Sequence, residues 1–144
     1  MAQKQNELPN ILTKKEIDDL LSQPNLRYPT GMRNYAFMKL LINSGIKLSE
    51  ATNLLWADLD LITRDLFLKG DNVLRSRKIT LDSDTLDTLI RWKNRQQINA
   101  DDCRYVFTTL NGNKLKNRYV REMIKRYADK AFISGSVSPQ TLRH

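Results

Sequence analysis

The sequence is poor in cysteine, histidine and long apolar runs, and each shortage excludes a class of protein. Cys103 is the only cysteine among 144 residues, so an internal disulfide cannot form and we expect an incidental thiol. One cysteine and one histidine do not supply the three or four ligands of a typical zinc site, so we expect no metal. The longest apolar stretch, residues 35–42, contains Lys39 and is too short to span a bilayer. The N-terminal residues lack the apolar segment of a signal peptide, so we expect a cytoplasmic protein without a membrane partner.

Acidic residues are also in the minority. The chain has 16 Asp and Glu against 24 Lys and Arg, which gives a formal net charge of +8. A polyanion such as DNA or RNA is therefore the first partner to consider, although many basic proteins never bind nucleic acid. The length and the hydrophobic fraction of 40% suit one domain with a buried core. We expect a flexible N-terminal lead over residues 1–11 and a single domain over residues 12–144.

Several helices are predicted from caps and apolar spacing. Thr13 and Glu16 form a capping-box pattern, which predicts a helix beginning at that point. Residues 33–43 are apolar on more than one face, as in a helix buried within a domain. A third helix is predicted from Ser49. Longer amphipathic helices are predicted over residues 83–92 and 118–131.

Between these helices the pattern changes to alternation. Leucines at positions 59 and 61, leucines at 66 and 68, and the segment 78–81 predict three short strands joined by turns. The predicted fold class is α+β, mainly helical with a small three-stranded antiparallel sheet.

Basic side chains gather in two of the predicted elements. On the last long helix, Arg118, Arg121 and Lys125 follow the spacing i, i+3, i+7 and share one face. Around the predicted hairpin lie Arg75, Arg77 and Lys78. Both groups are candidate contacts for the DNA backbone, which give affinity without reading bases, and the alternative is an ordinary solvated charged face.

Three segments resemble motifs of one known family. Residues 44–60, SGIKLSEATNLLWADLD, are similar to the first box of the tyrosine recombinases, or phage integrase family, written T-G-x-R-[IL]-S-E-x-x-x-L-x-W-x-D-[IL]-D. Lys69, ahead of residues 77–81, resembles the lysine of the family's β-hairpin. Residues 138–144, SPQTLRH, resemble the second box, H-x-L-R-H. The resemblance extends from about Leu12 to the end and implies a tyrosine-recombinase catalytic-domain-like fold.

The resemblance also implies a chemistry and its site residues. In this family a tyrosine attacks a DNA phosphodiester, two arginines clamp the phosphate and a lysine protonates the leaving oxygen, without a metal or another cofactor. The corresponding catalytic positions of this chain are Lys47, Lys69, Gln140 and Arg143. Only Lys69 and Arg143 keep the family's residue type, because Lys47 stands at the arginine of the first box and Gln140 at the histidine of the second.

Each of these positions has an alternative interpretation. Lys47 either contacts phosphate as a point charge or is a solvated turn residue, and Lys69 is either a phosphate contact or an exposed hairpin lysine. Arg143 either binds phosphate or forms an ion pair with a residue such as Glu50. Gln140 can donate a hydrogen bond to phosphate but cannot carry a proton.

The tyrosines give the last argument from the sequence. All five precede the second box, so none is at the family's nucleophile position, and we expect no strand cleavage by this polypeptide. The first functional hypothesis is a catalytically inactive protein that binds double-stranded DNA, as a regulator from a phage or mobile element or as an integrase remnant. The second is a fragment of a site-specific recombinase whose nucleophile lies in a missing C-terminal segment. The third is an interaction module that pairs with a full-length recombinase or with itself.

Overall fold

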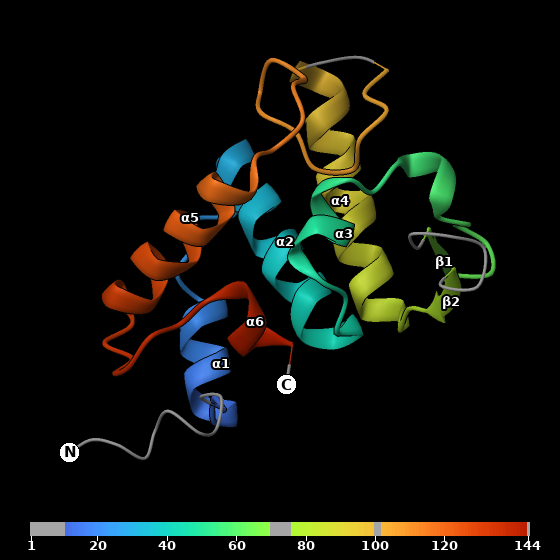
Figure 1. The fold of residues 1–144 in the computed structure, drawn as a ribbon. Helices are drawn as coiled ribbons and strands as arrows, with labels where there is room; N and C mark the ends of the chain where they lie inside the picture. The colour runs from blue at the N-terminus through green and yellow to red at the C-terminus, as the bar shows by residue number, and fades with distance from the viewer. Residues whose placement is uncertain (1–10, 70–75, 100–101, 144) are drawn as a thin grey trace.

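The computed structural model describes residues 11–69, 76–99 and 102–143. In Figure 1 the long helix α2 (Pro29–Ser44) runs through the middle of the molecule. Helix α5 (Asn117–Lys130) lies on one side of it and helix α4 (Ser83–Asn99) on the other. Three shorter helices, α1 (Lys14–Leu21), α3 (Leu48–Thr52) and α6 (Pro139–Leu142), also pack against this frame. Apart from Ile11, the predicted N-terminal lead is outside the described residues.

Helix α1 confirms the predicted N-terminus. The backbone N–H of Glu16 donates to Thr13 Oγ1 at 3.1 Å, and the N–H of Thr13 donates to Glu16 Oε1 at 2.9 Å. This reciprocal capping box satisfies two backbone donors that the first turn leaves without a helical partner. The cap therefore fixes where the chain enters the domain.

Helix α2 supplies much of the core. It begins at Pro29, whose fixed φ suits the first position of a helix, and it contains the whole range predicted from the sequence. Phe37, Leu40 and Leu41 are fully buried along it. The helix ends at Gly45, which adopts the left-handed φ of 73° that non-glycine residues rarely take.

Helix α2 also buries a charge. Arg33 is 3% exposed, and burial lowers its pKa although nearby phenols favour the charged form. Its Nη2 donates to the Tyr119 hydroxyl at 2.6 Å, and its Nη1 donates to the backbone carbonyl of Thr108 at 3.2 Å. These hydrogen bonds tie α2 to α5 and to the loop before it.

The sheet is smaller than expected. Strand β1 (Asp65–Leu68) pairs antiparallel with β2 (Arg77–Thr80), and the described residues contain these two strands rather than the three predicted. The predicted strand at Leu59 is reduced to a single bridge between Leu59 and Leu66. The Asp60 carboxylate accepts hydrogen bonds from the N–H groups of Ile62 and Thr63, at 2.8 and 3.1 Å, and this makes the chain turn. Alternating leucines therefore mark a turn here, in which Ile62 is 92% exposed.

Helices α4 and α5 complete the core. Trp92 of α4 is fully buried, and its Nε1 donates to the backbone carbonyl of Val106 at 2.7 Å. Helix α5 buries the apolar stripe predicted from its sequence, which includes Val120, Met123 and Ile124. The opposite face of α5 stays exposed and carries its basic residues.

Candidate functional site

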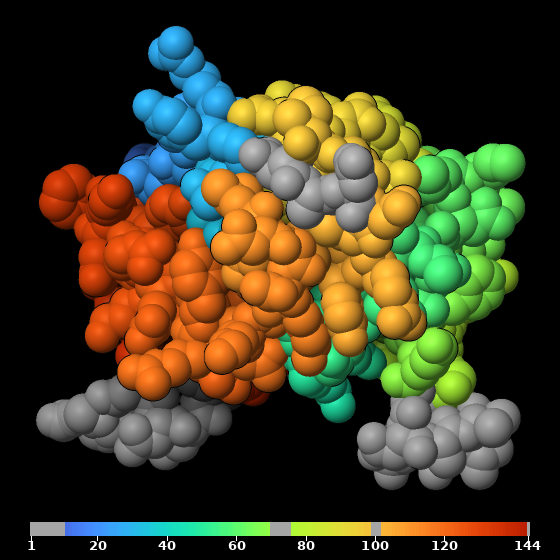
Figure 2. Space-filling model, turned by 90° about the horizontal axis from the view of Figure 1, so that it is seen from above, coloured from blue at the N-terminus to red at the C-terminus, as the bar shows by residue number. Residues whose placement is uncertain are grey.

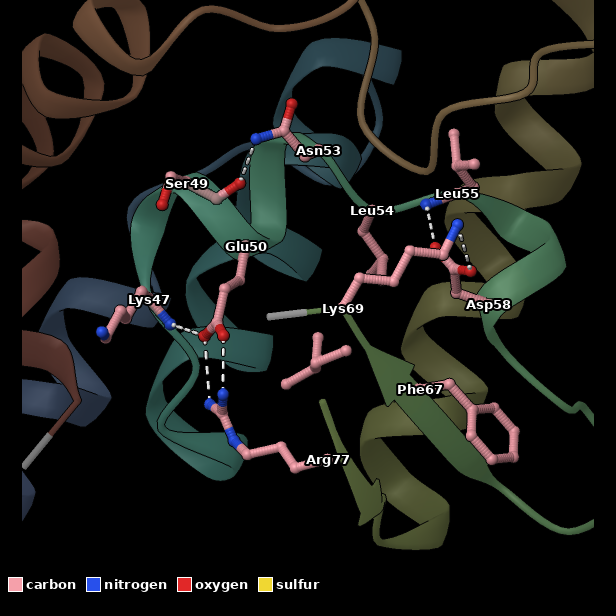
Figure 3. Close-up of a pocket in the computed structure, with 11 residues that line it drawn as sticks. Lys47, Ser49, Glu50, Asn53, Leu54, Leu55, Asp58, Phe67, Lys69 and Arg77 are labelled. Atoms are coloured by element: carbon pink, nitrogen blue, oxygen red, sulfur yellow. Dashed lines mark hydrogen bonds and ion pairs between the residues drawn. The ribbon is translucent and has the colours of Figure 1, made fainter. Parts of the chain in front are cut away.

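A cavity of about 570 Å³ opens between the first-box segment and the hairpin. Its wall comes from α3 and the residue before it, from the loop around the 3-10 helix η2 (Trp56–Asp58), and from the ends of β1 and β2 that meet there (Figure 3). The lining residues are Lys47, Ser49, Glu50, Asn53, Leu54, Leu55, Asp58, Phe67, Leu68, Lys69 and Arg77. Three cations and two carboxylates are among them.

Lys47 occupies the cap position of α3. Its backbone N–H donates to Glu50 Oε1 at 2.8 Å, so the carboxylate three residues later closes the first turn. Its exposed side chain points away from Glu50 (Figure 3). The local fold therefore fixes the backbone of Lys47 and leaves its side chain exposed.

Glu50 also holds Arg77 in a two-point ion pair. Arg77 Nη1 lies 2.6 Å from Glu50 Oε2, and Arg77 Nη2 lies 3.0 Å from Glu50 Oε1. Burial acts to raise the pKa of Glu50, but the hydrogen bonds from Arg77 and from the N–H of Lys47 outweigh it and bring the pKa below its ordinary value. The same pair raises the pKa of Arg77. Both groups are therefore charged at neutral pH.

Lys69 faces a second carboxylate. Its Nζ lies 3.8 Å from Asp58 Oδ1, which is a loose ion pair because the lysine side chain is 76% exposed. Asp58 also accepts a hydrogen bond from the N–H of Leu55 at 3.2 Å. The acid is thus held by its own loop, while the lysine side chain stays largely exposed.

The second-box segment reaches the first box through one contact. Ser138 Oγ accepts a hydrogen bond from the N–H of Thr141 and caps α6, and Arg143 follows as the last described residue. Arg143 Nε donates to the backbone carbonyl of Gly45 at 2.8 Å. The alternative partner expected for Arg143, Glu50, is held by Arg77 instead. Neither Arg143 nor the exposed Gln140 is among the residues that line the cavity.

The other cations that were predicted to contact DNA belong to the hairpin and to α5. Lys78 lies on β2 with its Nζ 3.9 Å from Asp65, and Arg75 lies outside the described residues. On α5, Arg118 Nε is 3.4 Å from Glu122, while Arg121 and Lys125 are exposed. Helix α5 and the hairpin lie at opposite sides of the molecule in both Figure 1 and Figure 2, so the two basic groups do not form one cluster.

The sequence did not predict which carboxylate each cation of the cavity contacts. The sequence indicates Glu50 as a residue of the third helix and a possible partner of Arg143, and it gives no separate signal for Asp58. The capping pattern from position 47 to Glu50 was a signal that this carboxylate lies beside Lys47. No comparable signal shows that Arg77 turns toward Glu50, since the two residues are 27 positions apart.

A metal-binding cluster and a membrane-spanning helix are both absent from the described part of the chain. Residues 11–69, 76–99 and 102–143 contain no group of three or more His, Cys, Asp or Glu side chains placed to hold a metal ion. Within the same ranges, no helix is both long enough and apolar enough to cross a membrane.

Comparison with known proteins identifies the family to which this chain belongs. Residues 10–144 match the model of the phage integrase family, and the chain belongs to that family. It is 28% identical over 144 residues to the tyrosine recombinase XerC of Pelotomaculum thermopropionicum, covering 95% of this chain and 47% of the relative. It is 30% identical over 138 residues to XerC of Actinobacillus pleuropneumoniae, covering 95% of this chain and 44% of that protein. The chain thus spans about half the length of the curated relatives it matches.

Solved structures show the same fold. The crystal structure of the XerA recombinase matches 94% of this chain with a TM-score of 0.82 and 21% identity, over 48% of its own length. The XerH site-specific recombinase, in a pre-cleavage complex with its difH substrate, matches 94% of this chain with a TM-score of 0.79 and 20% identity, over 41% of its length. The arrangement of a helical frame with a small antiparallel sheet is therefore that of a tyrosine recombinase domain.

Proposed function

We propose that this chain binds the phosphate backbone of double-stranded DNA without cleaving it, as a regulator or integrase remnant of a phage or mobile element. The observation that carries the proposal is the cavity, which is lined by both Lys47 of the first box and Lys69 of the hairpin. The proposed DNA-binding unit of this chain is a single domain over residues 12–144. The solved structures support a DNA partner, because that of XerH is bound to its difH substrate and that of the Tn1549 transposon integrase, which matches this chain with a TM-score of 0.80, is in complex with transposon right end DNA.

The charges around the cavity suit a phosphate. Lysine ammonium groups bind phosphate as point charges, and each neutralised phosphate releases condensed counterions, which makes binding depend strongly on salt. Arg143, held at Gly45 two residues before Lys47, adds a cation beside the same segment. The exposed residues of α5, Arg118, Arg121 and Lys125, are proposed as a separate contact with the DNA backbone.

The same positions argue against cleavage. Lys47 cannot give the two parallel hydrogen bonds of an arginine fork, and Gln140 cannot transfer a proton. Loss of one preorganised donor typically costs about 10²–10³ in rate, so two substitutions leave little activity. All five tyrosines lie within the described residues, and none of them lines the cavity. The recombinase-fragment and interaction-module hypotheses stay predictions.

Fluorescence anisotropy with a labelled duplex of about 30 base pairs tests the proposal. We expect log Kobs to fall linearly with log salt, and we expect Arg143→Ala to reduce both the affinity and the slope. Arg91→Ala, which removes an exposed arginine of α4 outside the cavity, is the control of equal charge change and leaves the slope nearer the wild-type value. Denaturing gels of the same mixtures are expected to show no covalent protein–DNA adduct. Absence of binding at low salt, or a covalent adduct, contradicts the proposal.

A further inference from the structure

Arg77 lies on the hairpin, and its exposed side chain turns toward Glu50 and lines the cavity. It is the first residue of β2 and pairs with Leu68, so it lies across the ladder from the residue that precedes Lys69. Its side chain lines the cavity and is 43% exposed, whereas the Glu50 side chain that holds it is 16% exposed. In Figure 3 the guanidinium lies directly below the Glu50 carboxylate, on the side of the cavity occupied by α3.

The ion pair orients the guanidinium without using up its donors. Arginine has five N–H donors, and the two hydrogen bonds to Glu50 use one on Nη1 and one on Nη2. Three donors therefore remain, in a plane whose direction Glu50 fixes. A guanidinium oriented in this way loses less side-chain entropy on binding an anion than one on an unrestrained side chain.

The balance of charge in the cavity depends on Arg77. Without it, the lining residues would include the two cations Lys47 and Lys69 and the two carboxylates Glu50 and Asp58, and their charges would cancel. With it, the wall has an excess positive charge beside Lys47. Lys47 itself offers only a point charge where the family's first box has an arginine fork.

We propose that Arg77, held by Glu50, is the guanidinium with which this cavity binds a backbone phosphate, in the place of the fork that position 47 lacks. This inference rests on the proposed function, because it names the phosphate-binding residue of the same site. Glu50 acts as a positioning residue: it holds the guanidinium of Arg77 through two hydrogen bonds, and it accepts a third from the backbone N–H of Lys47.

A simpler structural role for Arg77 would be to neutralise Glu50, and a charge-matched variant separates the two roles. Arg77→Ala alone leaves Glu50 as a partly buried acid without its partner, so its effect mixes both roles. The double variant Glu50→Gln, Arg77→Ala removes both charges and restores the net charge of the wild-type cavity. The glutamine oxygen still accepts the hydrogen bond from the N–H of Lys47.

Duplex binding is measured for the wild type, Glu50→Gln, Arg77→Ala and the double variant, with far-UV circular dichroism to confirm folding. We expect the double variant to bind about tenfold more weakly than the wild type at about 0.1 M salt, with a salt slope smaller by about 0.9, because one phosphate contact is lost. Glu50→Gln alone is expected to weaken binding less than the double variant does, because Arg77 is kept but is no longer oriented by a carboxylate. Wild-type affinity and slope in the double variant overturn the inference and leave the proposed function standing. A wild-type protein that does not bind the duplex overturns both.

Discussion

Replacing Gly31 with alanine is expected to destabilise the domain by about 3 kcal/mol, at the upper end of the usual cost of overpacking. A Cβ at this position would lie 1.9 Å from the backbone oxygen of Asn25 and 2.6 Å from its carbonyl carbon. Backbone atoms cannot rotate away as a flexible side chain can, so the loop before α2 must shift. Arg95 of α4 holds this loop by donating to the carbonyls of Leu26 and Arg27, at 3.1 and 2.8 Å.

Whether Gly31→Ala lowers or raises the free energy of unfolding distinguishes an effect of packing from one of helix propensity. Alanine is favoured over glycine in an exposed helix interior by about 1 kcal/mol, so propensity alone predicts a gain in stability. Urea unfolding followed by circular dichroism measures the difference. The control Asn94→Ala, at an exposed position of α4, is expected to change the unfolding free energy by less than about 0.5 kcal/mol. An unchanged or higher urea midpoint for Gly31→Ala contradicts the close approach of α2 to residue 25.

Replacing Lys47 and Lys69 together with alanine is expected to weaken duplex binding by about 100-fold at about 0.1 M salt. Both lysines line the cavity, and each lost phosphate contact corresponds to about a tenfold loss at that salt concentration. The backbone N–H of Lys47, which binds Glu50, is kept in the variant, so the start of α3 is preserved. The variant should therefore fold as the wild type does.

A second pair of lysines provides the matched control. Lys14 and Lys15 are exposed on α1, where they form i,i+4 ion pairs with Asp18 and Asp19, and they lie outside the cavity. Replacing both with alanine makes the same change in net charge and is expected to weaken binding by less than tenfold. Equal losses in the two double variants would show that only net charge drives the binding, against a specific role for the cavity.

Local patterns in the sequence were sufficient to predict much of the helical frame. The capping box at Thr13 and the apolar stripe of α5 depend on residues three or four positions apart, and both predictions are confirmed. The third strand was wrong because the side chain of Asp60 turns the chain at the point where leucines alternate. Burial of Arg33 was not foreseen, because its partner Tyr119 lies 86 positions away in the sequence.

In the candidate site too, the sequence predicted features that depend on nearby residues and did not predict contacts between residues far apart in the chain. The motifs singled out Lys47 and Lys69, and the fold places both at one cavity. The pair between Glu50 and Arg77 depends on the register that sets Arg77 opposite Leu68, which no periodicity in the sequence specifies. The motifs also suggested that Gln140 and Arg143 belong with Lys47, yet only Arg143 has a bond to the first-box segment, through the carbonyl of Gly45.

The most direct test of the central claim is to map the duplex onto the domain by NMR. Amide chemical shifts of the ¹⁵N-labelled chain are followed as the 30-base-pair duplex is added, at low salt and again at high salt. We expect the largest salt-sensitive shifts at residues 47–55, 67–69 and 77–80, which form the cavity wall and the adjoining strand, and further shifts on α5. Unperturbed amides around the cavity, whether or not other regions shift, would contradict the claim that this site binds the DNA backbone.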